Sequence, residues 1–165
     1  MQSYRKIRAK PRPGVVYLLM ALLFFLGTTA LLGGYGLMAN PSGEALGMSA
    51  TWLAGTPFRS YFLPGLVLFF VLGVMPLVAV YVLWTKPVWT PMRGLESLTH
   101  HHWSWLAAVA LGVTLLVWIV VQVVMLGLIS VLQPLYGLLA LLMLGAAFLP
   151  SVRHHYALKE KGIKK

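Results

Sequence analysis

The sequence contains no cysteine and only three acidic residues in 165 positions. Without cysteine the chain has no disulfide, no thiolate metal ligand and no thiol nucleophile. With so few carboxylates, no paired acid–base site is evident, and neither a Ser/His/Asp arrangement nor a phosphate-cradling loop is recognisable. We therefore expect a protein that is not an enzyme and that needs no cofactor.

Ionisable side chains are also missing from the middle of every long apolar run. A charge at the centre of a bilayer costs at least about 2.5–3.5 kcal/mol, so a charge that occurs there usually has a use. Their absence argues against proton relays, ion-coupled transport and intramembrane proteolysis. It also argues against a histidine that ligates haem at mid-depth.

What the chain does contain is apolar residues, which make up 59% of it, whereas charged residues make up 10%. Soluble domains have about 45–50% apolar and about 25% charged residues. Four segments provide the roughly 20 apolar residues that a membrane crossing needs, at 15–38, 60–84, 104–128 and 132–150. The last two belong to one apolar block, which is divided where Ser130, Gln133 and Pro134 cluster. We predict an all-α polytopic membrane protein, a four-transmembrane-helix bundle in one domain spanning 1–165.

The net charge of +10 is concentrated outside these segments. Twelve of the thirteen Lys and Arg residues lie in the tails, 1–14 and 151–165, or in the loop 85–103, and only Arg59 lies in the loop 39–59. Cytoplasmic loops of membrane proteins carry such an excess of positive charge, so both termini are predicted to be cytoplasmic. Loop 39–59 is then the outer loop and 85–103 the inner loop. The basic tails should meet anionic lipid headgroups, and we expect no nucleic-acid partner.

Within the predicted helices, Gln122 is the strongest polar group at depth. It shares one helical face with Ser104, Ala108, Leu111 and Leu115. In the first helix Gly27, Ala30 and Gly34 form a stripe of small residues, which in membranes usually marks close helix packing. Gln122 is interpreted as packing glue or, alternatively, as a ligand contact in a cavity that also contains Tyr35 and lies under the outer loop.

Two further groups of side chains are candidates for a role outside the hydrocarbon. Glu44 and Arg59 are the two charges of the outer loop, and their opposite signs suggest an ion pair. At the inner side, His100, His102, His154 and His155 are candidate ligands for a metal or for haem iron. The neighbouring Trp and Tyr residues favour the alternative, histidines at headgroup depth.

Three stretches carry a resemblance to known proteins: NPSGEALGM at Asn40–Met48, GTPF with LPG at Gly55–Gly65, and WIVVQ with LQPLYG at Trp118–Gly137. With them, the chain resembles a family of small bacterial integral membrane proteins with four helices. The resemblance implies residence in the bacterial inner membrane, and it implies neither an activity nor site residues.

Three functions remain open at this point. The chain is expected to be a structural or accessory component that packs through its small-residue helix faces, against other membrane subunits or a second copy. The alternatives are a small-molecule transporter or ligand-binding protein with a cavity near Gln122, and a metal- or haem-binding redox component that uses the histidines.

Overall fold

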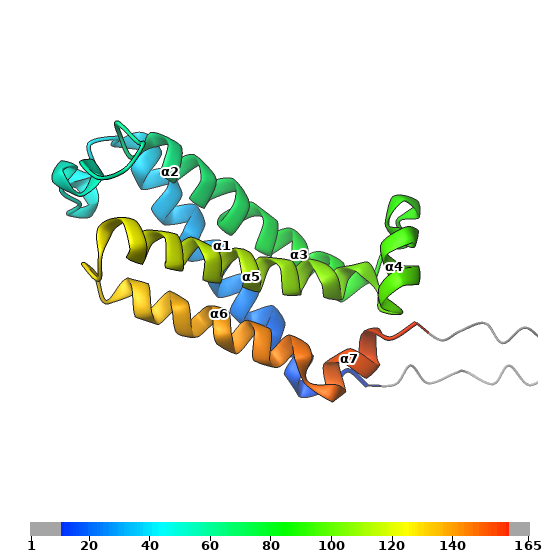
Figure 1. Ribbon diagram of the computed structural model, residues 1–165. Helices are drawn as coiled ribbons and strands as arrows, with labels where there is room; N and C mark the ends of the chain where they lie inside the picture. The colour runs from blue at the N-terminus through cyan, green and yellow to red at the C-terminus, as the bar shows by residue number, and fades with distance from the viewer. Residues whose placement is uncertain (1–10, 159–165) are drawn as a thin grey trace, which may run out of the picture.

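The computed structural model describes residues 11–158, apart from the side chain of Ala50 (Figure 1). Most of the predicted basic tails, residues 1–10 and 159–165, lie outside the described residues. The structure is 78% helical, and the described part contains no strands. The first long helix is α1 (Gly14–Ala39). The second is continuous from α2 (Phe62–Val67) through the π-helical segment η3 (Leu68–Val74) to α3 (Met75–Thr85), and we call it the second span. The third is α5 (Trp103–Leu126), and two shorter helices follow it, α6 (Leu132–Phe148) and α7 (Pro150–Tyr156).

Three of these helices are long and apolar enough to cross a membrane, or four when α6 and α7 count as one span bent by 61°. At 1.5 Å per residue, α1 is about 39 Å long, which exceeds the roughly 30 Å of a bilayer's hydrocarbon core. The prediction of an all-helical protein with several membrane-spanning segments is therefore confirmed. The fourth crossing, formed by α6 and α7 together, stays a prediction.

The prolines of the second span act in two different ways. Pro64 lies in the first turn of α2, where backbone N–H groups have no acceptor within the helix. The N–H that proline lacks therefore costs no helical hydrogen bond. Pro76 lies deeper, and its ring would clash with the carbonyl of Leu72 in a regular α-helix. The wider π-helical turns of η3 precede it, with the Met75 N–H bonded to the Phe70 carbonyl. The expected disturbance thus widens the helix locally, and Phe62–Thr85 continues as a single span.

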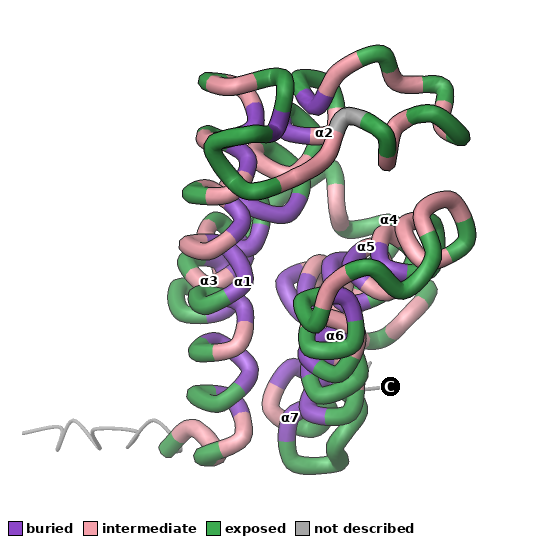
Figure 2. Tube along the Cα trace, turned by 90° about the vertical axis from the view of Figure 1, so that its left-hand side faces the viewer, coloured by how far each residue is buried: buried purple, intermediate pink, exposed green. Residues whose placement is uncertain are grey.

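The helices form two layers, with α1 and α2–α3 in one and α5, α6 and α7 in the other (Figure 2). The residues between the layers are buried, whereas the outward faces are apolar and exposed, as in Val124, which is 78% exposed. An apolar outer face suits a surrounding of lipid tails. We call the end with residues 40–61 and 127–131 the hairpin end, and the opposite end, with Arg12 and Tyr156, the tail end.

The core is densest in the half of the bundle toward the tail end. Leu19 and Leu23 of α1, Leu83 of α3 and Met143 of α6 are at most 1% exposed. Trp105 of α5 donates its indole N–H to the Ala147 carbonyl at 2.8 Å, and the Tyr156 hydroxyl donates to the Leu83 carbonyl at 2.9 Å. The first bond joins α5 to α6 within one layer, and the second joins α7 to α3, so it ties the two layers together at this end.

The small-residue stripe of α1 packs against the second span of the same chain. A Cβ atom on Gly34 would lie 2.6 Å from the Phe69 backbone nitrogen, and one on Gly27 would lie 2.7 Å from Leu77 Cδ2. The contact at Gly34 is with backbone atoms and requires glycine, so this residue sets how closely α1 and the second span approach. The face on which the predicted accessory role depends is therefore occupied within the chain, and that role stays a prediction.

The connections are short helical turns. The loop at the hairpin end contains the 3₁₀ turns η1 (Glu44–Leu46) and η2 (Ala50–Leu53). At the tail end, the turn η4 (Thr90–Met92) leads into α4 (Arg93–Thr99), which stands across the long helices (Figure 1). The break between α6 and α7 falls at Leu149, whose extended backbone is the conformation favoured before a proline such as Pro150.

Candidate ligand-binding site

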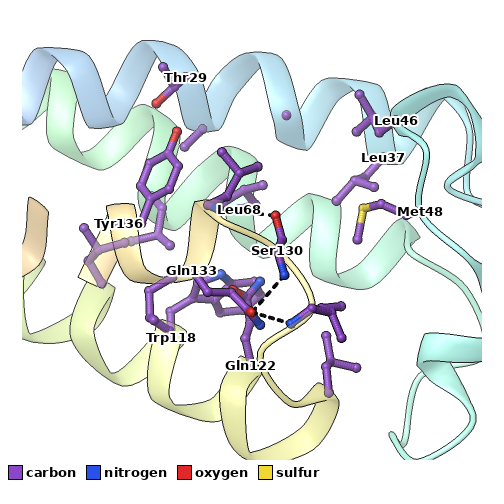
Figure 3. Close-up of a pocket in the computed structure, with 18 of the residues that line it drawn as sticks. Thr29, Leu37, Leu46, Met48, Leu68, Trp118, Gln122, Ser130, Gln133 and Tyr136 are labelled. Carbon is purple, nitrogen blue, oxygen red and sulfur yellow. Dashed lines mark hydrogen bonds between the residues drawn. The ribbon is translucent and has the colours of Figure 1, made fainter. Parts of the chain in front are cut away.

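A cavity of about 450 Å³ lies between the two layers near the hairpin end (Figure 3). Its walls come from α1, η3, α5, α6 and the turn between α5 and α6, and the loop residues Leu46, Met48 and Trp52 also line it. Most of the lining is aliphatic, and no ionisable side chain other than a tyrosine contributes to it. Its polar side chains are Thr29, Trp118, Gln122, Ser130, Gln133 and Tyr136. We call this space the hairpin-end cavity.

Three of these side chains have no hydrogen-bond partner among the described residues: Trp118, Gln122 and Tyr136. Trp118 and Gln122 are one helical turn apart on α5 and so lie on the same face. Tyr136 extends from α6 toward Thr29 of α1 (Figure 3). All three side chains are half-buried and line the cavity, so their donors and acceptors are available to bond to a molecule there.

Gln133, by contrast, makes three hydrogen bonds within the protein. It is 5% exposed, and its Oε1 accepts from the backbone N–H groups of Ile129 at 3.0 Å and Ser130 at 3.3 Å. Its Nε2 donates to the Gly127 carbonyl at 3.0 Å. One amide thereby satisfies three backbone groups of the turn that joins α5 to α6, and it fixes the rim of the cavity. The sequence showed Gln133 only as a sign that the apolar block divides there.

The loop over the cavity is anchored by Tyr61. This residue is 2% exposed, its hydroxyl donates to the Ser49 carbonyl at 2.7 Å, and its backbone N–H donates to the Pro41 carbonyl at 2.9 Å. Burial raises the pKa of Tyr61, which keeps the hydroxyl protonated as a donor. Gly43 has φ +83°, and a Cβ there would lie 2.7 Å from the Tyr61 ring. The Tyr61 ring and a glycine-dependent turn together hold Leu46 and Met48 at the cavity.

The other residues predicted for this region lie elsewhere. Tyr35 is 65% exposed and does not line the cavity, because it is on the outward face of α1. Glu44 and Arg59 are both exposed, and the structure forms no ion pair between them. The expected contribution of Tyr35 and the expected pairing of the two loop charges are not found.

At the tail end, backbone pairing brings the two histidine segments together. The His102 N–H donates to the Tyr156 carbonyl at 2.8 Å, and the Leu158 N–H donates to the His100 carbonyl at 2.9 Å. The side chains diverge, however: His100 and His154 are exposed, and within residues 11–158 no three His, Asp or Glu side chains are placed to share a metal ion. The candidate metal ligands are thus close in the backbone but are not gathered around one point.

His102 has a structural role at the start of α5. Its Nδ1 accepts from the Ser104 backbone N–H at 3.2 Å, which makes His102 the N-cap of the helix. Its Nε2 lies 3.9 Å from Glu96 Oε1. Burial lowers the pKa of His102, against the opposing effect of Glu96, and so favours the neutral ring whose Nδ1 can accept. A capping acceptor is a role that the spacing of the histidines did not indicate.

Fold and surface define the class of this protein: it is all-helical, and three or four of its helices could cross a membrane. Beyond that class, no protein-family model matches the chain, and neither a curated protein nor a solved structure is similar to it. The resemblance drawn from the three loop and hairpin motifs therefore stays a prediction.

Proposed function

We propose that this chain is a multi-pass protein of the bacterial inner membrane that binds a small, uncharged and mostly apolar molecule in the hairpin-end cavity. The observation that supports it is a cavity of about 450 Å³ in which Trp118, Gln122 and Tyr136 have no partner among the described residues. Ligand sites typically have about 300–1,000 Å³, apolar walls and a few convergent polar groups. The hairpin-end cavity has all three properties.

The lining favours a particular ligand chemistry. Aliphatic walls from Leu26, Leu68 and Leu115 suit an alkyl or ring system. The Gln122 amide offers both a donor and an acceptor, and the Trp118 indole offers a donor. A charged ligand would lose its hydration without meeting an opposite charge, so a neutral molecule with one or two polar groups fits best.

Binding is favoured over passage through the bundle. Between the cavity and the tail end, the interior is filled by side chains such as Leu19, Leu23 and Met143, which are at most 1% exposed. Among the described residues, the core there contains no Asp, Glu, Lys, Arg or His to couple movement to an ion. The cavity therefore has the form of a site that is reached from the hairpin end.

The charge distribution supports an orientation with that end outside. Twelve of the thirteen Lys and Arg residues belong to the tails and to the loop 85–103, and by the positive-inside rule this favours a cytoplasmic tail end. The proposed ligand then enters from the outer side of the membrane, either from the aqueous phase or from the outer leaflet.

Photolabelling with a dodecanol that carries a diazirine tests the proposal. The protein is reconstituted in lipid vesicles, irradiated with the probe and mapped by peptide mass spectrometry. We expect labelling at the lining residues Trp118, Gln122 and Tyr136 that saturates and is displaced by unlabelled dodecanol. Labelling that increases in proportion to probe concentration, or that spreads over outward residues such as Val124, would indicate only contact with bulk lipid and would refute the proposal.

Two glycine substitutions provide a matched pair. Gly33 lines the cavity, and a Cβ on it meets only Leu68 Cδ2 at 3.4 Å, an ordinary contact. Gly145 is on the outward face of α6, with nothing within 4 Å of its Cβ position. Gly33→Leu should fill part of the cavity and lower the saturable labelling severalfold, whereas Gly145→Leu should leave it unchanged. Equal labelling of the two variants would contradict the assigned site.

A further inference from the structure

A second concave surface lies on the outward side of α1 and α3, toward the tail end. It is a shallow apolar groove of about 390 Å³, lined by Phe24, Leu77, Val80, Tyr81, Trp84 and Thr85. None of these residues lines the hairpin-end cavity. Tyr81 is 65% exposed and Trp84 51%, so the groove opens toward the surroundings of the bundle.

A cation lies at the tail-end limit of this groove. The Arg12 guanidinium carbon is 4.1 Å from the centroid of the Trp84 ring, and Arg12 Nη2 donates to the Trp84 carbonyl at 2.6 Å. Tyr17 packs edge-to-face on the same indole, with the ring centroids 6.2 Å apart. Because a guanidinium has five N–H donors and this contact uses one nitrogen, Arg12 retains donors for an anion. Trp and Tyr around a cation are typical of headgroup depth.

The positive charge at this place has no carboxylate to balance it within residues 11–158. The one ion pair there joins His102 to Glu96, so Arg12 and Lys86 are without an acidic partner in this range. Lys86 donates to the His155 carbonyl at 2.8 Å, with its Nζ 4.3 Å from the centroid of the Tyr156 ring. Burial and, after it, the nearby charge of Arg12 lower the pKa of Lys86. A local positive field of this kind attracts an anion.

The distance along α1 from its first residue to Phe24, which lines the groove, matches the depth of one lipid leaflet. Phe24 is ten residues into α1 from Gly14, about 15 Å along the helix axis. Half of the hydrocarbon core of a bilayer is also about 15 Å. With Arg12 at headgroup depth, Phe24 is near the bilayer centre, and the groove between Trp84 and Phe24 covers the depth that an acyl chain occupies.

We propose that Arg12 and this groove form a binding site for an anionic phospholipid of the leaflet at the tail end. Arg12 receives the phosphate, and one acyl chain lies along Trp84, Tyr81 and Phe24. A zwitterionic lipid can fill the groove with its acyl chain, but its own cationic group is repelled by Arg12. Free phosphate can reach Arg12, but it has no acyl chain to bury in the groove. Both should therefore bind more weakly than an anionic phospholipid. The site does not depend on the hairpin-end cavity or on its ligand.

Native mass spectrometry of the full chain in mild detergent tests this site. The protein is incubated with equimolar dioleoylphosphatidylglycerol and dioleoylphosphatidylcholine, and the retained lipid is counted. We expect the wild type to retain the anionic lipid in about fivefold excess, the factor that one cation at headgroup depth supplies. Arg12→Gln should bring the two lipids close to parity. Arg93→Gln, which removes an exposed cation of α4 at the same end, should leave the excess unchanged.

The groove is tested by a second pair of variants. Tyr81 and Tyr35 are both 65% exposed, and only Tyr81 lines the groove. Tyr81→Ala should reduce the amount of both lipids retained, while Tyr35→Ala should not. Equal losses in the two arginine variants would show diffuse attraction to positive charge. If Tyr81→Ala leaves lipid retention unchanged and glycerol 3-phosphate displaces the anionic lipid, the protein binds only the headgroup and the groove does not bind an acyl chain. Either result overturns the proposal.

Discussion

Two glutamines near the hairpin end show how differently one residue type is used. Gln133 makes three hydrogen bonds to the backbone of the turn that joins α5 to α6. Gln122, on α5, makes none within the described residues and lines the cavity. The first is a structural residue, and the second is available to a ligand.

The pair predicts different effects of the same substitution on stability and on ligand binding. Gln133→Leu leaves two N–H groups and one carbonyl unpaired, so the free energy of unfolding should fall by about 2 kcal/mol. Gln122→Leu removes no bond within the described residues and should lower it by less than about 0.5 kcal/mol while reducing saturable photolabelling. Unfolding in mixed micelles with increasing dodecyl sulfate measures both variants. If Gln122→Leu lowers the free energy of unfolding by about 1 kcal/mol or more, Gln122 stabilises the packing of the helices and is not reserved for a ligand.

Sequence reasoning found Gln122 because a lone amide in an apolar helix is conspicuous. It missed the role of Gln133 because that role depends on where the chain turns. The amide reaches Gly127, Ile129 and Ser130 only after α5 ends at Leu126 and the chain reverses. Likewise, the charges of Glu44 and Arg59 indicate attraction, but pairing needs a loop geometry that their types do not specify.

At the scale of helices, glycines determine the contact between α1 and the second span. A Cβ on Gly34 would lie 2.6 Å from Phe69 N and 2.8 Å from the Gly65 carbonyl oxygen. These are backbone atoms, which cannot move aside as a flexible side chain does. Gly33, the preceding residue, would place its Cβ 3.4 Å from the end of Leu68.

We predict that Gly34→Ala destabilises the protein by about 2 kcal/mol or more, because the two helices must separate. Gly33→Ala should be neutral or stabilising by up to about 1 kcal/mol, since alanine is the better helix former. The same micelle unfolding assay measures both. Equal stability of the two variants would show that the α1 contact tolerates separation and that its close approach is not important.

The helices themselves were predictable from the sequence because length and apolar composition are what a bilayer selects. The details were not. Pro76 indicates a disturbed helix, but whether the helix kinks or widens depends on how its neighbours pack, and here η3 widens before it. Pro150 indicates an end, but the 61° bend between α6 and α7 depends on the packing of Val152 and Tyr156, both buried.

At the scale of the whole molecule, the arrangement in two layers creates the sites. The layers are tied together at the tail end by the hydrogen bond from Tyr156 of α7 to the Leu83 carbonyl of α3. Toward the hairpin end they leave the cavity of about 450 Å³. Helical periodicity identifies the inward face of each helix, but it does not give the separation between two helix pairs. The sequence could therefore suggest a cavity near Gln122 only as one alternative.

The orientation of the whole chain gives a last prediction, and the lack of cysteine makes it simple to test. Ser42 in the hairpin-end loop, Ser97 on α4 and Ser151 on α7 are all exposed, so each can carry a single cysteine without a background thiol. A membrane-impermeant maleimide should label Ser42→Cys in intact spheroplasts. Ser97→Cys and Ser151→Cys should react only after permeabilisation, because the positive-inside rule places both in the cytoplasm.

Ser151→Cys also decides how many times the chain crosses. If α6 and α7 do not form a span, the chain crosses three times and residue 151 lies on the same side as residue 42. Labelling of Ser151→Cys in intact spheroplasts would then match that of Ser42→Cys. That result would contradict the fourth crossing and the common location of the two termini. Protection of Ser42→Cys with labelling of Ser97→Cys would instead invert the orientation and place the cavity on the cytoplasmic side.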